Sequence, residues 1–112
     1  MTHLPQKILV IGGSGFLGSH VADQLSTLGY KVTIYDKFES PYLSADQDMI
    51  IGDLSYDALD AAINGMDIVY HFAAIADIQE SNENPYACIH ANVLGSTNVF
   101  EAVRKNKVSK LL

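Results

Sequence analysis

Short apolar runs alternate along this chain with longer segments whose apolar residues recur at helical spacing. The apolar runs predict strands at 7–11, 31–35, 49–51, 67–74 and 110–112. Helical periodicity predicts helices at about 14–28, 56–63 and 85–105. A longer polar segment at 38–47 reads as a surface loop. This alternation of strand and helix predicts an α/β domain with a parallel sheet.

Capping residues mark the ends of the predicted helices. Gly29 follows the first helix, where a glycine in the left-handed conformation commonly ends a helix. Ser55 stands before the second helix and is expected to cap it, and Asn64-Gly65 is expected to end it. Pro85 begins the long third helix. These residues set the helix boundaries more sharply than the periodicity does.

Residues 7–18 read Lys-Ile-Leu-Val-Ile-Gly-Gly-Ser-Gly-Phe-Leu-Gly, an apolar strand that runs into a glycine-rich turn and a helix. Gly12 permits the tight turn, Gly15 lets the main chain approach a phosphate, and Gly18 lets the helix close onto the sheet. Such a turn presents N–H groups at the positive end of a helix dipole, where a pyrophosphate can bind. The alternative interpretation is a strand–turn–helix corner without a ligand, because glycines at this spacing are a weak pattern by themselves.

The position of this turn on the first strand predicts the topology. Right-handed crossovers between strand–helix units give an open, doubly wound parallel sheet of the Rossmann type with strand order 3-2-1-4. The cofactor crevice of such a sheet lies where the order reverses, between the first and fourth strands. Lys110-Leu111-Leu112 reads as the beginning of a fifth strand, so we expect residues 1–112 to form a single, incomplete NAD(P)-binding domain.

Acidic residues follow two further strands. Asp36 ends the second strand at about the spacing from the glycines at which dinucleotide-binding domains carry a carboxylate for the adenosine ribose. A carboxylate there repels a 2′-phosphate and favours NAD over NADP, although Lys37 weakens the preference because a nearby cation tolerates a phosphate. An ordinary loop aspartate is the alternative. Gly52-Asp53-Leu54 ends the third strand on the same edge, where a carboxylate and a following N–H can bind adenine.

Composition narrows the class of partner. A chain of 112 residues, 48% hydrophobic and 18% charged, is typical of one soluble, globular domain. Its net charge of −6 and its lack of a basic patch argue against a nucleic-acid or anionic-membrane partner. No segment is apolar for long enough to cross a bilayer, and the start of the chain does not resemble a signal peptide. Cys88 is the single cysteine, and we expect a cytoplasmic protein. The scattered histidines predict no metal site.

Four stretches across nearly the whole chain resemble the N-terminal part of the extended short-chain dehydrogenase/reductase family, in particular its NAD-dependent nucleotide-sugar epimerases and dehydratases. They occur in the family's order: Gly-Gly-Ser-Gly-Phe-Leu-Gly at 12–18, Gly-Asp-Leu at 52–54, His-Phe-Ala-Ala at 71–74, and Asn-Pro-Tyr through Asn-Val-Leu-Gly-Ser-Thr-Asn-Val-Phe-Glu-Ala at 84–102. Each stretch is modest alone, and together they are specific. The resemblance implies bound NAD and a nucleotide-sugar substrate.

Motif and resemblance together define the expected cofactor-binding residues. In chain order these are Gly12, Gly15, Phe16, Leu17, Gly18, Asp36, Lys37, Asp53, Leu54, Phe72, Ala73, Ala74 and Asn92. By resemblance, residues 12–18 hold the pyrophosphate, Asp36 the ribose and residues 53–54 the adenine. The segment 72–74 lines the ribose and pyrophosphate, and Asn92 helps to position the active site. His71 is expected to be a half-buried structural histidine rather than a catalytic one.

The catalytic part of the family pattern is missing from this chain. Catalysis in the family resembles proton transfer by a tyrosine whose pKa is lowered by a lysine four residues on. None of the six tyrosines is followed by a lysine at that position. We therefore expect no catalytic residue here, no turnover by this chain alone, and a piece of a longer enzyme. A non-catalytic NAD-binding or redox-sensing module and a structural α/β domain without cofactor are the alternatives.

Self-association is a further expectation. If the later strands are absent, the edge of the fourth strand and apolar surface meant for burial are exposed. Pairing with another copy through that sheet edge or that apolar surface would cover them.

Overall fold

The computed structural model describes residues 6–72 and 84–112. Its elements are β1 (Lys7–Ile11), α1 (Phe16–Thr27), β2 (Lys31–Asp36), β3 (Asp48–Ile51), α2 (Tyr56–Ile63), β4 (Ile68–His71), α4 (Pro85–Lys105) and β5 (Lys110–Leu111). The strands form one parallel sheet in the order β3-β2-β1-β4-β5. The Rossmann-type, doubly wound sheet is confirmed, and the predicted order 3-2-1-4 continues into β5.

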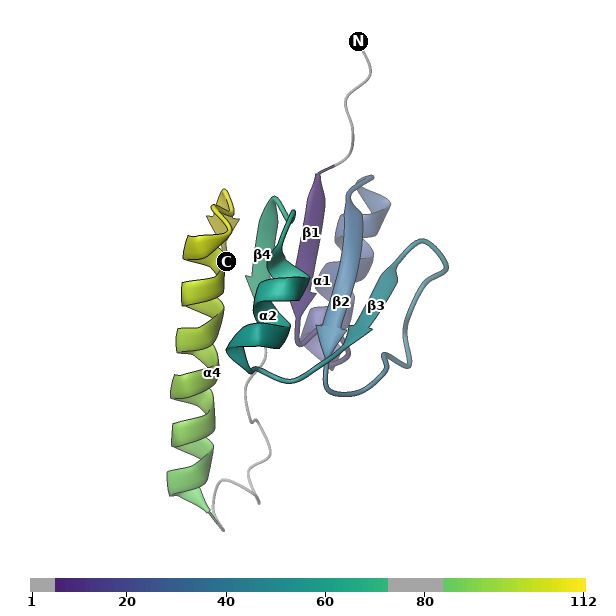
Figure 1. The fold of residues 1–112 in the computed structure, drawn as a ribbon. Coiled ribbons are helices and arrows are strands. Elements are labelled where there is room, and N and C mark those ends of the chain that lie inside the picture. Colours follow the sequence, from purple (N-terminus) through teal and green to yellow (C-terminus); the bar gives the residue numbers. More distant parts are fainter. Residues whose placement is uncertain (1–5, 73–83) are drawn as a thin grey trace.

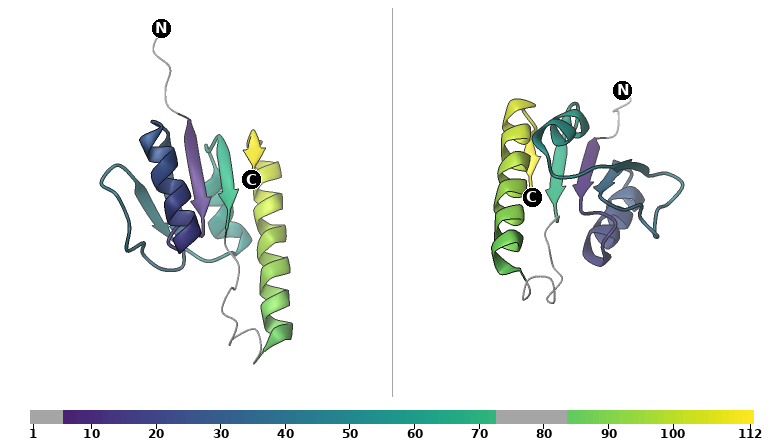
Figure 2. Two further views of the ribbon diagram at one scale, coloured as in Figure 1. Left: turned by 180° about the vertical axis from the view of Figure 1, so that it is seen from behind. Right: turned by 60° about the horizontal axis from the view of Figure 1, so that its bottom comes forward.

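Helices cover both faces of this sheet (Figures 1 and 2): α1 packs on one face, and α2 and α4 pack on the other. Ile8 and Val10 of β1 belong to the apolar cluster beneath α1. Leu9 and Ile11 belong to the cluster beneath α2 and α4. Because both faces of β1 are buried, its sequence is apolar at successive positions instead of alternating with polar ones.

The predicted boundaries agree closely with the observed ones for β1, α2 and α4. The helix α1 begins at Phe16 instead of 14 because the glycine turn extends to Gly15, which is its N-cap. Gly29 ends this helix with a φ of +94°, as predicted. Ser55 occupies the N-cap position of α2, but the prediction that its side chain caps the helix was wrong. Its main-chain N–H donates instead to Asp53 Oδ1 at 3.0 Å.

The outer edge of β4 is covered by β5. Ile68 and Val69 pair with Lys110 and Leu111. The ladder continues past the end of β5, since Leu112 N donates to Val69 O at 2.8 Å. The expectation of an exposed β4 edge was therefore wrong, because even a two-residue strand satisfies the main-chain groups on that side. The outermost strands of the described sheet are β3 and β5.

Candidate functional site

The segments predicted to bind a cofactor gather at one edge of the sheet. All strands run in the same direction, so their carboxyl ends lie together at the lower edge in Figure 1. The turn 12–15 follows β1, Asp36 ends β2, the turn 52–54 follows β3, and Phe72 follows β4. The ladder extends into these segments, since Gly52 N donates to Asp36 O at 3.0 Å. In open α/β sheets, ligands bind in a crevice at this edge.

Gly12, Gly15 and Gly18 contribute to the first turn in different ways. Gly12 has a φ of +84°, a left-handed conformation that side chains disfavour. A Cβ at Gly18 would collide with the main chain of Gly12 and would lie 2.9 Å from Gly13 Cα. A Cβ at Gly15 would find only Gly12 O, at 3.6 Å. The packing of the turn thus requires Gly12 and Gly18, whereas the space in front of Gly15 is open to a ligand.

The N-terminus of α1 has the properties of an anion site. Its N-cap, Gly15, supplies no side-chain capping bond, and no acidic side chain stands in the first turn. The first N–H groups of a helix lack partners within the helix and carry the positive end of its dipole. Phe16 and Leu17, which begin α1, are 76% and 62% exposed. An uncapped helix end behind a turn with no obstructing Cβ fits a pyrophosphate.

The Asp36 carboxylate is oriented by the glycine turn. Its Oδ2 accepts a hydrogen bond from Ser14 N at 3.1 Å, and its Oδ1 accepts one from Lys37 N at 2.7 Å. Ser14 Oγ also donates to Phe38 O at 2.7 Å, so the turn is bonded to β2 and to the loop after it. A carboxylate has about four acceptor positions, and these two bonds leave capacity for ribose hydroxyls.

The turn after β3 carries a second carboxylate at this edge. Asp53 is exposed, and hydrogen bonding from Ser55 holds the pKa of its carboxyl below the ordinary value, with a smaller contribution from the charge of Lys37. Asp53 is therefore ionised at neutral pH and is ready to accept hydrogen bonds. Lys37 acts on this carboxylate and follows Asp36 directly, so its cation lies at the predicted adenosine end of the site.

The fourth segment is described only in part. Phe72 N donates to Ile11 O at 2.7 Å, which places its main chain beside the start of the glycine turn. Its ring stacks on Tyr70 at a centroid distance of 6.2 Å and packs against the cluster beneath α1. The predicted residues Ala73 and Ala74 lie outside the described residues. Asn92 is partly buried within α4.

His71 ends β4 and connects it to α4. Its Nε2 shares a hydrogen bond with Ser96 Oγ at 3.1 Å, while its buried Nδ1 has no partner. Burial lowers the pKa of the imidazole, which is therefore neutral at pH 7. The half-buried position is as predicted, the link to α4 was not predicted, and the structural role stays a prediction.

Three polar side chains that the sequence analysis did not single out organise the site: Ser14, Tyr35 and Asn98. Ser14 bonds to the end of β2 through its N–H and to the loop after β2 through its Oγ. The Tyr35 hydroxyl donates to Asp53 O, and Asn98 Nδ2 donates to Leu54 O. A tyrosine near the end of a buried strand and an asparagine inside a helix are weak signals for such roles, because the partner of each polar group is set by the tertiary structure.

Residues 6–72 and 84–112 lack two other features, a cluster of metal ligands and a membrane-spanning helix. In this part of the chain, no three His, Cys, Asp or Glu side chains come together as metal ligands would. None of its helices has both the length and the apolar character that a bilayer crossing needs.

The strand order, the glycine turn after β1 and the carboxylate at the end of β2 define a dinucleotide-binding domain of the Rossmann type. The particular family follows from comparison with known sequences. The chain belongs to the NAD dependent epimerase/dehydratase family, whose sequence profile matches residues 8–112. The family resemblance carried by the four motifs is thereby confirmed.

Individual relatives agree with this family. The chain is 33% identical over 124 residues to a bifunctional UDP-glucose 4-epimerase and UDP-xylose 4-epimerase of Pisum sativum, covering 96% of this chain and 35% of the relative. It is 34% identical to the human sterol-4-alpha-carboxylate 3-dehydrogenase (decarboxylating), covering 96% of this chain and 28% of the relative. The chain thus spans about a third of the length of the curated relatives it matches.

A solved structure supports the same assignment. The complex of Thermus thermophilus UDP-glucose 4-epimerase with NAD superimposes with a TM-score of 0.86 at 30% identity, covering 95% of this chain and 36% of that one.

Proposed function

We propose that this chain binds NAD along the carboxyl edge of its sheet. The pyrophosphate would rest on residues 12–18, the adenosine ribose on Asp36, and the adenine against residues 53–54. The observation that carries the proposal is the uncapped N-terminus of α1 behind an open Gly15, with the Asp36 carboxylate hydrogen-bonded to the same turn. The NAD complex of the Thermus thermophilus relative supports it.

The remaining predicted residues complete this proposed site. Phe16 and Leu17 would pack their exposed side chains against the cofactor, and Asn92 would help to order the active-site region. The Ala73 and Ala74 side chains would leave room for the cofactor's ribose and pyrophosphate. We propose NAD in preference to NADP, because Asp36 presents a fixed negative charge where a 2′-phosphate would lie. Lys37 reduces that preference without reversing it.

The proposed activity is that of a nucleotide-sugar epimerase or dehydratase. Bound NAD supplies a hydride acceptor and donor in this chemistry. The residues of this chain bind and orient the cofactor, and no Tyr-x-x-x-Lys pattern occurs among its 112 residues to move the substrate proton. We therefore propose that the chain alone does not turn over a nucleotide sugar.

Calorimetric titration of the purified chain with NAD and NADP tests the proposal. We expect binding of NAD, weaker binding of NADP, and no conversion of UDP-glucose or UDP-galactose when NAD is added. Turnover by this chain would contradict the proposal that it lacks the residues for proton transfer. Failure of both dinucleotides to bind at millimolar concentration would overturn the cofactor site and favour a structural α/β domain.

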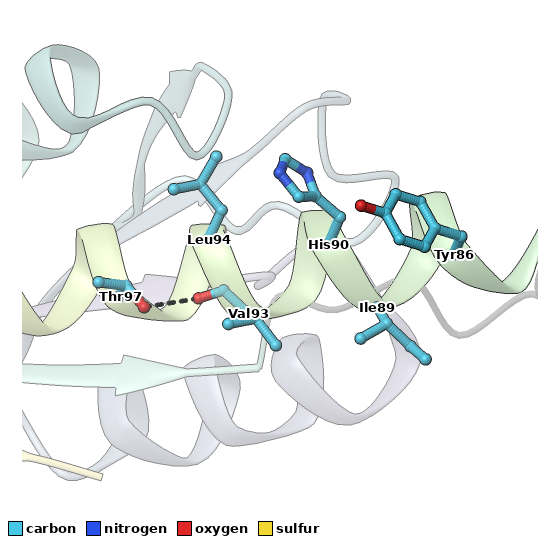
Figure 3. Close-up of a pocket in the computed structure, with 6 residues that line it drawn as sticks. All are labelled: Tyr86, Ile89, His90, Val93, Leu94 and Thr97. Atoms are coloured by element: carbon cyan, nitrogen blue, oxygen red, sulfur yellow. Dashed lines mark hydrogen bonds between the residues drawn. The ribbon is translucent and has the colours of Figure 1, made fainter.

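We also propose that the chain self-associates through α4. Six side chains along this helix border a hollow of about 400 Å³ (Figure 3): Tyr86, Ile89, His90, Val93, Leu94 and Thr97. Tyr86, Ile89 and Val93 are 82%, 64% and 62% exposed. Exposed apolar side chains in a contiguous row are typical of surfaces that another protein covers.

Light scattering on a concentration series tests self-association. We expect the mass of the wild type to rise above that of a monomer, and Val93→Asp to remain monomeric because it places a charge in the apolar row. Ile51→Asp is the matched control, since Ile51 is 62% exposed on the edge strand β3. A wild-type monomer at all concentrations would contradict the proposal, and loss of association in Ile51→Asp alone would locate it at the sheet edge.

A further inference from the structure

The turn after β3 is held from two sides by side chains that are distant in sequence. Tyr35, in β2, donates its hydroxyl to Asp53 O at 2.5 Å. Asn98, in α4, donates its Nδ2 to Leu54 O at 2.8 Å. Two consecutive carbonyl groups of one turn are thus bonded to β2 and to α4, and the Tyr35 side chain lies on the face of the sheet that α4 covers.

Packing leaves the turn little freedom. A Cβ at Gly52 would collide with the Tyr35 hydroxyl and would lie 2.8 Å from its Cζ. A Cβ at Gly95 of α4 would lie 2.6 Å from Leu54 Cδ1. The Tyr35 ring is 1% exposed and belongs to the core. The turn therefore contacts a rigid part of the molecule at both positions where it is hydrogen-bonded.

Because the peptide group is planar, a hydrogen bond that fixes a carbonyl oxygen also fixes the direction of the next residue's N–H group. In a trans peptide, the carbonyl oxygen and the amide hydrogen of the next residue point in opposite directions. Tyr35 holds Asp53 O, so the N–H of Leu54 points away from the core. Asn98 holds Leu54 O, which aims the N–H of Ser55, and this N–H donates to Asp53 Oδ1 at 3.0 Å. One bond thus aims a donor, and the other orients the carboxylate.

Burial, followed by the negative charge of Asp53, raises the pKa of the Tyr35 hydroxyl. The hydroxyl therefore remains a protonated donor at neutral pH, and its bond to the turn does not depend on pH in that range. The amide of Asn98 is likewise a donor at every pH.

We propose that Tyr35 and Asn98 are positioning residues for base recognition in this site. They hold the Leu54 N–H and the Asp53 carboxylate as a donor–acceptor pair matched to the amino-pyrimidine edge of adenine. The inference rests on the proposed NAD site and extends it to two residues that need not touch the ligand. Adenine offers a ring acceptor beside an amino donor, and hypoxanthine reverses both groups. The pair therefore selects adenine over hypoxanthine.

Titration with NAD and with nicotinamide hypoxanthine dinucleotide tests this inference, because the two ligands differ only at that edge of the base. We expect the wild type to prefer NAD by about tenfold, the equivalent of about one charge-assisted hydrogen bond. In Tyr35→Phe and in Asn98→Ala, NAD affinity should fall about tenfold, while affinity for the hypoxanthine dinucleotide should change less than about twofold. A purely structural role would lower both affinities equally and leave their ratio unchanged.

Tyr30→Phe is the matched control, since Tyr30 precedes the opposite end of β2 and packs beneath α1. It should keep the full preference for NAD. Asn98→Ala provides an independent measurement if Tyr35→Phe fails to fold. An unchanged NAD preference in the folded variants, or a wild type that binds both dinucleotides equally, would overturn the positioning role while leaving the NAD site in place. A wild type that binds neither would overturn the proposed function and this inference with it.

Discussion

Gly15→Leu is expected to lower NAD affinity by about 100-fold or more, the equivalent of two charge-assisted hydrogen bonds to the pyrophosphate. The new side chain would stand in the open space before the N-terminus of α1, where the phosphates must approach. The fold should persist, because Gly15 has a φ of −78° and a Cβ there meets only Gly12 O at 3.6 Å. Calorimetry with NAD and a thermal unfolding curve measure the two effects separately.

Two comparison variants make this result specific. Gln24→Leu adds the same side chain at an exposed position further along α1 and should leave NAD affinity unchanged. Gly18→Ala should instead affect stability. It should lower the free energy of unfolding by about 1–3 kcal/mol, because its Cβ meets the main chain of the turn. Equal NAD affinity in Gly15→Leu and the wild type would show that the pyrophosphate does not bind at this turn.

Asp36→Asn is expected to lower NAD affinity about tenfold and to raise affinity for NADP. The substitution keeps the shape of the side chain but removes the charge that accepts the ribose hydroxyls and repels a 2′-phosphate. The N–H groups of Ser14 and Lys37 now donate to different oxygens of the carboxylate, so one of them would keep an acceptor on the amide oxygen and the other would face the amide NH2. The ratio of the NAD and NADP dissociation constants, measured by calorimetry, is the decisive quantity.

Asp46→Asn is the control for the change of net charge, since Asp46 is exposed in the loop before β3. It should leave both dissociation constants unchanged. If Asp36→Asn keeps the NAD preference of the wild type, the Asp36 carboxylate does not discriminate between a ribose hydroxyl and a 2′-phosphate. Loss of NADP affinity in Lys37→Ala would show that the cation favours the 2′-phosphate and thereby reduces the preference for NAD.

Local sequence predicted the frame of the site well, for physical reasons that concern neighbouring residues. The run at 7–11 is apolar throughout because β1 is covered on both faces, and its bounds were predicted without error. Gly12 adopts the left-handed conformation that a turn directly after a strand requires. Asp36 lies at the carboxyl end of β2, as predicted, because the apolar run of this strand ends at Tyr35.

The failures of prediction concern hydrogen bonds that residue type alone does not determine. Ser55 stands where a helix-capping residue should, yet the neighbouring Asp53 carboxylate takes its N–H and no side-chain cap forms. The edge of β4 was expected to be exposed, and Lys110 and Leu111 cover it. Neither outcome follows from residue type, because each depends on which polar groups the fold brings within hydrogen-bonding distance.

The glycine turn, the acidic residue after β2 and the order of the elements were determined by the sequence itself, because backbone conformation and strand direction depend on residues close together in the chain. Only the tertiary structure decided how the turn 52–54 is held. Tyr35 reaches it from β2 and Asn98 reaches it from α4, and no sequence pattern links either residue to the turn. A hydrogen bond between distant residues exists only once packing has placed donor and acceptor about 3 Å apart.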